Sequence, residues 1–260
     1  MEYLIVCVVA IFVSGVTLFS GFGLGTVLMP AFALFFPVPI AIAATAVVHL
    51  ANNVFKIILV GKNADWDVIR WFALPGAVAA IFGAVVLHWF AHSSPLFVYQ
   101  ISTQAHYITT TKLVIGFLII VFACFELIPR LSNMAFDRKY LFHGGLLSGF
   151  FGGLSGNQGA LRSAFLIKAG LSKEAFVGTG TVSAVIVDVS RLLVYGVTFY
   201  TSKIVEVGNI WSLVAAATLA AFLGSFLGAR LIKKITLRVM QIIVGIMLIV
   251  VGIGMATGII

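Results

Sequence analysis

The sequence predicts an all-α, polytopic membrane protein, and three observations support this fold class. Of the 260 residues, 62% are hydrophobic and only 9% are charged, whereas a soluble domain is about half apolar and about a quarter charged. Stretches such as residues 239–260 are long and apolar enough to cross a bilayer. The period-two alternation of a membrane barrel does not occur, and lipid cannot satisfy an open backbone, so helices are expected. A single membrane domain accounts for residues 1–260.

Ten apolar segments follow one another along the chain. They cover roughly residues 3–19, 22–36, 39–60, 69–91, 111–128, 140–155, 158–167, 175–199, 208–231 and 239–259. The stretch from Ala91 to Thr111 is the least apolar and is rich in serine and threonine. It is predicted to be an exposed loop that can carry a short interfacial helix through Phe97 and Tyr99.

The two halves of the sequence resemble each other in order and spacing. The first turn, Ser20-Gly21-Phe22-Gly23, resembles Ser148-Gly149-Phe150-Phe151-Gly152. Asn53-x-x-Lys56 aligns with Asp188-x-x-Arg191, and Phe82-Gly83-Ala84 resembles Leu223-Gly224-Ser225. Because each half has five segments, the second would be inserted upside down, as in the inverted repeats of many transporters. Repeat one is predicted at about 3–128 and repeat two at about 140–259.

The net charge of +8 is carried mainly between the apolar segments, which is typical of topology signals and not of nucleic-acid binding. If the loops alternate along ten crossings, one side collects eleven lysines and arginines, and the other collects Lys112 and Lys203. The first side is therefore predicted to be cytoplasmic. Both termini would then lie outside the cytoplasm of a cell membrane, taken to be a bacterial inner membrane.

Residues 140–168 provide only 29 positions for two segments. At about 1.5 Å per residue they cannot make two full crossings of a core about 30 Å thick. The sequence leaves open whether 3–36 and 140–168 cross fully or dip in and return. Because non-helical backbone inside a membrane is tolerated where it lines protein or water, the turns near 20–25 and 148–159 are candidate cavity linings.

The second turn combines several glycines with Ser155, Asn157 and Gln158, and Arg162 follows Gln158 by one helical turn. Free amides at a helix start suit an anion, and the serine and amide side chains add neutral donors. Close helix packing through the glycines is the alternative interpretation. The string lacks the Lys-Ser or Lys-Thr of a Walker loop.

Lys56, Arg162 and Arg191 are cations inside apolar segments, where Asp188 is the matching carboxylate, so two positive charges remain in surplus. Burying such charges is costly unless something negative visits them, and a positive cavity concentrates anions. Two alternatives stay open. Lys56 can reach the headgroups from its place near a segment end, and Asp188 can neutralise Arg191 one helical turn away.

The candidate substrate-binding residues are Gly21, Gly23, Gly25, Asn53, Lys56, Gly153, Ser155, Gly156, Asn157, Gln158, Arg162, Asp188 and Arg191. His49, one turn before Asn53, is expected to be mainly a hydrogen-bonded packing residue, with a proton shuttle as the alternative. Thr45, Asn52, Thr179, Thr181 and Ser183 are read as interhelical hydrogen-bonding residues or path linings. No catalytic residue, metal site or cofactor is predicted.

Three features together resemble the TauE/SafE family of sulfite-exporter-like (TSUP) membrane permeases, over essentially the whole chain. They are the repeated glycine-rich turns Ser20–Gly25 and Gly149–Gly159, the Ala/Thr-rich stretches Ala41–Thr45 and Ala175–Thr181 that follow them, and the small-residue helices around Gly83 and Gly224–Gly228. The resemblance implies a membrane transporter of small anions, often sulfur oxyanions or organosulfonates.

The function favoured by these observations is alternating-access transport of a small anion, with the lipid bilayer as surroundings and no nucleic-acid partner. A membrane enzyme acting on a lipid or phosphorylated carrier is an alternative, but it would need more acid–base groups than the sequence offers. A scaffold protein that transports nothing is the second alternative. A homo-oligomer is compatible with the sequence, which does not reveal substrate identity, direction or driving force.

Overall fold

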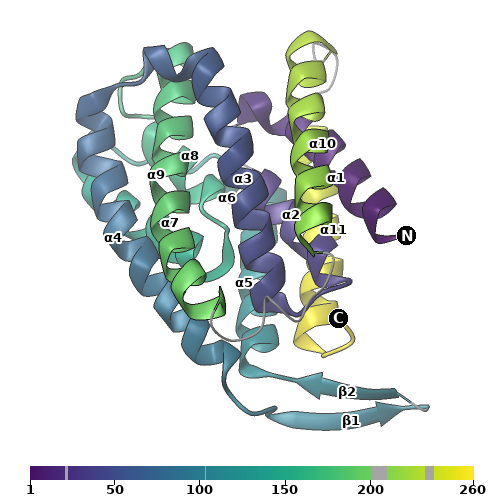
Figure 1. The fold of residues 1–260 in the computed structure, drawn as a ribbon. Coiled ribbons are helices and arrows are strands. Elements are labelled where there is room, and N and C mark those ends of the chain that lie inside the picture. Colours follow the sequence, from purple (N-terminus) through teal and green to yellow (C-terminus); the bar gives the residue numbers. More distant parts are fainter. Residues whose placement is uncertain (21–22, 103, 201–209, 232–236) are drawn as a thin grey trace.

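Eleven helices and one hairpin make up the part of the chain that this computed structural model describes, which is residues 1–260 without 21–22, 103, 201–209 and 232–236 (Figure 1). The helices are α1 (Glu2–Ser20), α2 (Leu24–Ala33), α3 (Val38–Val60), α4 (Trp66–Ala91), α5 (Thr110–Leu127), α6 (Pro129–Ser132), α7 (Leu141–Ser155), α8 (Gly159–Leu166), α9 (Lys173–Tyr200), α10 (Ile210–Leu231) and α11 (Leu237–Ala256). Two short 3-10 turns, Gly61–Asn63 and Arg138–Tyr140, precede α4 and α7.

The predicted all-α membrane fold is confirmed, because every predicted apolar segment contains a helix with similar bounds. Five helical stretches among the described residues are long and apolar enough to cross a membrane: Val38–Ile58, Trp66–Ala91, Thr110–Leu127, Lys173–Thr198 and Ile210–Gly228. Local chemistry sets several of the ends. Asp65 caps α4 by accepting from the backbone of Asp67 and Val68, and Thr109 caps α5 by accepting from the backbone of Lys112.

Three of the helices that fill predicted apolar segments are too short to cross on their own, as is the four-residue α6. α2 has 10 residues, α7 has 15 and α8 has 8. At about 1.5 Å per residue, they span roughly 15, 22 and 12 Å of a core about 30 Å thick. Glycine makes both breaks, since Gly23 before α2 has φ 121° and Gly156 after α7 has φ 81°, values that glycine adopts without a steric penalty.

The stretch between α4 and α5 corrects one expectation. It contains no helix but an antiparallel hairpin of β1 (Phe97–Ile101) and β2 (Gln104–Ile108), which projects beyond the helices in Figure 1. Its exposure was expected, and the side chain of Phe97 is 68% exposed. Both strands are rich in aromatic and β-branched residues, which favour a pleated strand over a helix. Tyr99 donates a hydrogen bond to the Thr257 carbonyl and so fixes the hairpin to the end of α11.

The tightest helix contacts join backbone to backbone through glycine. A Cβ added at Gly145, Gly149 or Gly153 of α7 would overlap the carbonyl oxygens of Phe72, Gly76 or Ala80 of α4. Similarly, Gly224 and Gly228 of α10 lie against the carbonyls of Ile11 and Gly15 of α1. In both pairs the contacting residue numbers rise together, so the two helices run parallel. We call these contacts the α4–α7 and α1–α10 seams.

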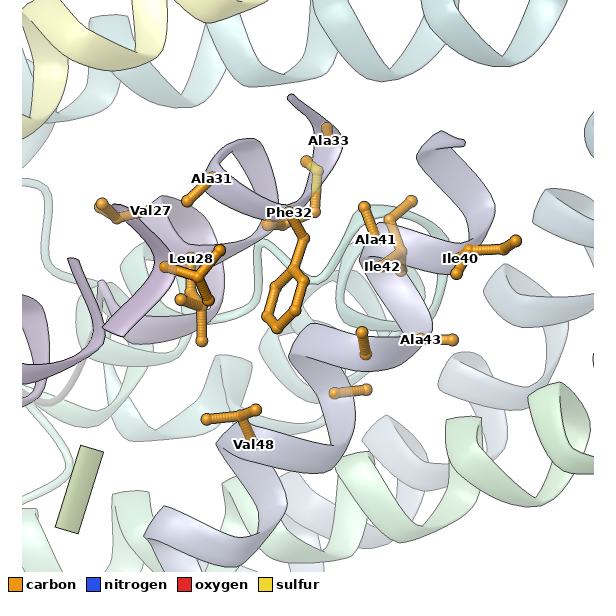
Figure 2. Close-up of a cluster of buried hydrophobic side chains, with 14 of the residues drawn as sticks. Val27, Leu28, Ala31, Phe32, Ala33, Ile40, Ala41, Ile42, Ala43 and Val48 are labelled. Carbon is orange, nitrogen blue, oxygen red and sulfur yellow. The ribbon is translucent and has the colours of Figure 1, made fainter. Parts of the chain in front are cut away.

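Two other pairs run antiparallel. In α5 and α11, Gly116 lies against Gly252, and Leu127 lies against Gly245. In α3 and α9, His49 contacts Asp188 and Ile57 packs near Val182. The main apolar core lies around α2, the first half of α3 and the facing parts of α1, α5, α10 and α11. Figure 2 shows the ring of Phe32 pointing from α2 toward α3 within this core.

Candidate functional site

A fully buried carboxylate, Asp188 of α9, lies at the centre of the candidate site. Its Oδ2 is 2.6 Å from Nδ1 of His49 on α3. Its Oδ1 accepts from Gln158 Nε2 at 3.1 Å and from Arg191 Nε and Nη2 at 3.0 and 2.7 Å. A carboxylate that accepts this many hydrogen bonds, two of them from a guanidinium, stays ionised and holds its neighbours in place. Asp188 therefore ties α3, α9 and the turn between α7 and α8 together.

Arg191 is enclosed on all sides and is paired within the protein. Besides Asp188, its Nη1 donates to the Gly152 carbonyl at 3.1 Å. Tyr195, one turn further along α9, donates to the neighbouring carbonyl of Gly153. These two carbonyls belong to the last turn of α7, where a helix carries partial negative charge. Of the two roles considered for Arg191, the internal pair with Asp188 is the one present in this structure.

The two glycine breaks meet beside His49. A Cβ added at Gly25 of α2 would lie 3.1 Å from the Gly156 carbonyl and 3.7 Å from the His49 ring. A Cβ at Gly156 would lie 3.2 Å from Arg191 Nη1. The close approach explains why glycine occupies both places, because a side chain at either would press on the opposite backbone or on the arginine. Gly21, in the same predicted turn, lies outside the described residues.

The helices that leave the two breaks begin without a side-chain cap. Neither Gly23 at the start of α2 nor Gln158 at the start of α8 makes a side-chain capping hydrogen bond. The first N–H groups of a helix have no partner within it, and the helix dipole adds partial positive charge there. Gly25 near the start of α2 lies against Gly156, three residues before α8, so the two uncapped helix starts lie near each other, and free N–H groups at helix starts suit an anion.

Lys56 and Arg162 lie in the same interior. Lys56 of α3 is 6% exposed, and Arg162 of α8 is 4% exposed. They are close enough for their positive charges to repel each other, and Arg162 also feels the charge of Asp188. No hydrogen bond or ion pair joins Lys56 to a residue within the described ranges. In this structure Lys56 is buried, so the alternative in which it reaches the headgroups is not the one observed.

The remaining predicted residues surround this centre. Asn53 Nδ2 is 3.2 Å from the ring nitrogens of His49. Ser155 donates to the Phe151 carbonyl within α7, and Asn157 Nδ2 donates to Ser155 Oγ at 3.2 Å. The Oδ1 atom of Asn157 is buried and accepts no hydrogen bond in the described structure. The turn between α7 and α8 thus contains a buried acceptor oxygen that has no hydrogen-bond donor among the described residues.

The polar residues that the sequence assigns to bonds between helices divide into three groups. Asn52 accepts from Ser225 of α10 at 2.8 Å, and Thr179 of α9 accepts from the backbone of Asp65 at 2.9 Å. Thr181 instead donates to the Val177 carbonyl within its own helix. The hydroxyls of Thr45 and Ser183 are buried and make no hydrogen bond among the described residues.

Sequence reasoning undervalued His49 and missed Tyr195. His49 was assigned mainly to packing, yet it bonds both Asn53 and Asp188, which occupy matching positions in the two halves of the sequence. Two signals were available. His49 precedes Asn53 by one helical turn, and Tyr195 follows Arg191 by one turn, so each extends a polar face already recognised. Among the described residues, no group of three His, Cys, Asp or Glu side chains could hold a metal ion.

One comparison with known proteins gives a match, and this match covers nearly the full length of the chain. The family model described as "Sulfite exporter TauE/SafE" matches residues 3–255. Neither a curated protein nor a solved structure matches the chain significantly.

Proposed function

Because the chain belongs to the TauE/SafE family of sulfite exporters, a family of membrane transporters, we propose that it carries a small anion by alternating access. The substrate class we favour is a sulfur oxyanion or an organosulfonate. The family supports transport itself, and the interior of this chain supports the charge of the cargo. An anion is the kind of solute that an interior with three buried cations, Lys56, Arg162 and Arg191, beside the buried carboxylate of Asp188 in the same helix bundle would attract.

The observation that carries the proposal is the buried pair of Lys56 and Arg162. Lys56 has no hydrogen bond or ion pair among the described residues, and such a buried cation inside a membrane protein is expensive and marks a solute pathway by default. Asp188 is already bonded to His49, Gln158 and Arg191, so it cannot serve Lys56 as well. A visiting anion would relieve the repulsion between the two cations. Guanidinium also fits the planar or tetrahedral shape of an oxyanion better than ammonium does.

Backbone groups at the two breaks support the same class of cargo. The uncapped starts of α2 and α8 supply N–H donors beside the cations, as broken helices do in other transporters. We assign anion contact to Lys56, Arg162, Asn157 and these amides. Arg191 and Asp188 are assigned a positioning role, because their mutual bonds hold the end of α7 where the breaks meet.

Alternating access is supported by the packing directions of the helices. If α1–α5 and α7–α11 are related by a pseudo-two-fold axis in the membrane plane, α5 and α11 should run antiparallel to each other, and so should α3 and α9. The α4–α7 and α1–α10 seams should likewise be equivalent. Both antiparallel pairs and both seams are present in the packing. We therefore retain the assignment of repeat one to about 3–128 and repeat two to about 140–259.

Uptake into vesicles tests the proposal. The purified full-length chain is reconstituted, and entry of sulfite, sulfate, thiosulfate and 2-hydroxyethanesulfonate is measured beside empty vesicles. Lys56→Gln and Arg162→Gln should each reduce uptake of the transported anion by at least tenfold. The matched control Lys62→Gln, an exposed lysine outside α3, should leave uptake unchanged. Wild-type uptake by a folded double variant K56Q/R162Q would contradict the proposal, and so would the failure of every anion to enter.

A further inference from the structure

His49 lies where the two repeats meet. Binding of an anion does not by itself require a histidine at this place. Its ring is buried between Asp188 on α9 and Asn53 on its own helix, and the backbone of Gly25 on α2 lies against its edge. The residue thus touches both repeats at the place where the two breaks meet. Histidine is the side chain whose unperturbed pKa lies closest to neutral pH, which makes His49 a candidate proton carrier.

The hydrogen bonds determine which nitrogen of His49 carries its proton. An ionised carboxylate only accepts, so Nδ1, at 2.6 Å from Asp188, must donate. The Nε2 atom of the neutral ring is then an acceptor, and Asn53 Nδ2 donates to it at 3.2 Å. A second proton would have to arrive at Nε2. The Asn53 amide would then have to turn and present its oxygen to Nε2.

The charges that face His49 make that second proton dependent on an anion. Burial opposes a positive ring most strongly, Asp188 on α9 favours one, and Arg191 on α9 and Arg162 on α8 oppose it. Lys56 lies two turns further along α3, and its charge is repelled by that of Arg162. The facing residues of α2 and of the turn between α7 and α8, Gly25 and Gln158, are neutral. An anion held by Arg162 and Lys56 would cancel opposing charge, so it would raise the proton affinity of the ring.

We propose that this protein carries protons together with its anion, and that Nε2 of His49 is the proton-binding atom. The inference rests on the anion transport proposed above. Binding linkage is reciprocal, so a ring that gains a proton must also bind the anion more tightly. One proton enters on His49 from the side that delivers the anion, and it leaves from the same nitrogen after the anion has left on the other side. The proton moves without any change of oxidation state.

The test uses vesicles with a pH-sensitive dye inside and 2-hydroxyethanesulfonate outside, because this sulfonate stays ionised and cannot carry a proton itself. Sulfite is run in parallel. Wild-type protein should acidify the interior as the anion enters. With one proton per monovalent anion, a gradient of one pH unit, acid outside, should accumulate the anion about tenfold, the equivalent of 1.4 kcal/mol. His49→Gln should abolish both effects while anion exchange persists at a reduced rate.

The control is His143→Gln, which changes an exposed histidine at the start of α7 and should behave as the wild type. Anion entry without acidification by the wild type overturns proton coupling and leaves anion transport standing. Acidification that survives in H49Q overturns the assignment to His49. Absence of any anion entry overturns both proposals together. If H49Q does not fold, the wild-type dye signal still decides whether protons accompany the anion.

Discussion

At the scale of single residues, the energetics of the site depend on Asp188. Its two oxygens accept four hydrogen bonds from three residues, and its charge is the one that balances the fully buried guanidinium of Arg191. Removing one member of a buried ion pair leaves an uncompensated charge, which costs more than the pair contributes when intact. Asp188 is therefore expected to stabilise the folded protein as well as to serve its function.

Asp188→Asn is expected to lower the unfolding free energy by about 3–5 kcal/mol, because Arg191 would remain buried without its counter-ion. A lower melting temperature of the detergent-solubilised protein would reveal the loss. The control Asp67→Asn breaks the Arg138 pair on the surface, which is more than half exposed on both sides and should contribute about 0–1 kcal/mol. The double variant D188N/R191Q should recover part of the loss. Equal melting of D188N and D67N would rule out this account.

The sequence anticipated only part of this residue network. The Asp188–Arg191 pair follows from spacing, since residues three apart share a helix face. Its closure, with Gly152 and Tyr195 completing the arginine's surroundings, was one of two alternatives left open. The contact of His49 with Asp188 joins residues 139 positions apart, and no local pattern encodes it. Such contacts are decided by how α3 and α9 pack.

At the scale of elements, glycine does two different jobs in this chain. In the breaks it permits positive φ, as at Gly23 and Gly156. In the α4–α7 and α1–α10 seams it removes the side chain so that two backbones can touch. The sequence pattern alone offered both interpretations for the glycines around 149–159. The structure assigns Gly149 and Gly153 to the seam and Gly156 to the break.

Gly153→Ala is expected to destabilise the fold by about 1–3 kcal/mol, because its methyl group would overlap the Ala80 carbonyl of α4, and neither backbone can yield freely. The readout is thermal stability in detergent. Gly196→Ala is the matched control. It lies in α9 with open space where the Cβ would stand, so the change should be neutral or slightly stabilising. If both variants melted alike, close backbone contact would not be what stabilises the seam.

The hairpin shows where the prediction of elements failed. Composition correctly indicated exposure between α4 and α5, but serine and threonine content concealed two short strands that contain aromatic and β-branched residues. The pairing is set by contacts such as Tyr99 with His106, and by the bond from Tyr99 to the end of α11. That anchor lies more than 150 residues away in the sequence, so local propensity could not reveal it.

At the scale of the whole molecule, the order of helices was predictable but their interweaving was not. Hydrophobic stretches gave the bounds of the long helices, because crossing a bilayer demands length and apolarity. The seams, in contrast, join helices from different halves of the sequence. Weak internal similarity can suggest that two halves are related, but it does not say which helix of one half packs on which helix of the other.

The uneven distribution of lysine and arginine between the loops predicts which side of the membrane each loop faces. With Cys7 and Cys124 replaced by alanine, single cysteines at Asn63 and Ser94, both exposed, serve as reporters. A membrane-impermeant maleimide applied to intact bacterial cells should label Ser94→Cys, and it should label Asn63→Cys only after the membrane is opened. Labelling of Asn63→Cys in intact cells would reverse the predicted orientation.

The two seams also determine what happens if the polypeptide is cut. A cut after Asn133, between α6 and α7, would leave α4 without α7 in one fragment and α10 without α1 in the other. Each fragment would expose glycine-lined backbone to lipid and should be degraded when produced alone. When the two fragments, residues 1–133 and 134–260, are produced together, they should associate through both seams and unfold at the same temperature as the uncut chain. A stable fold therefore requires both halves of the chain, whether one gene encodes them or two.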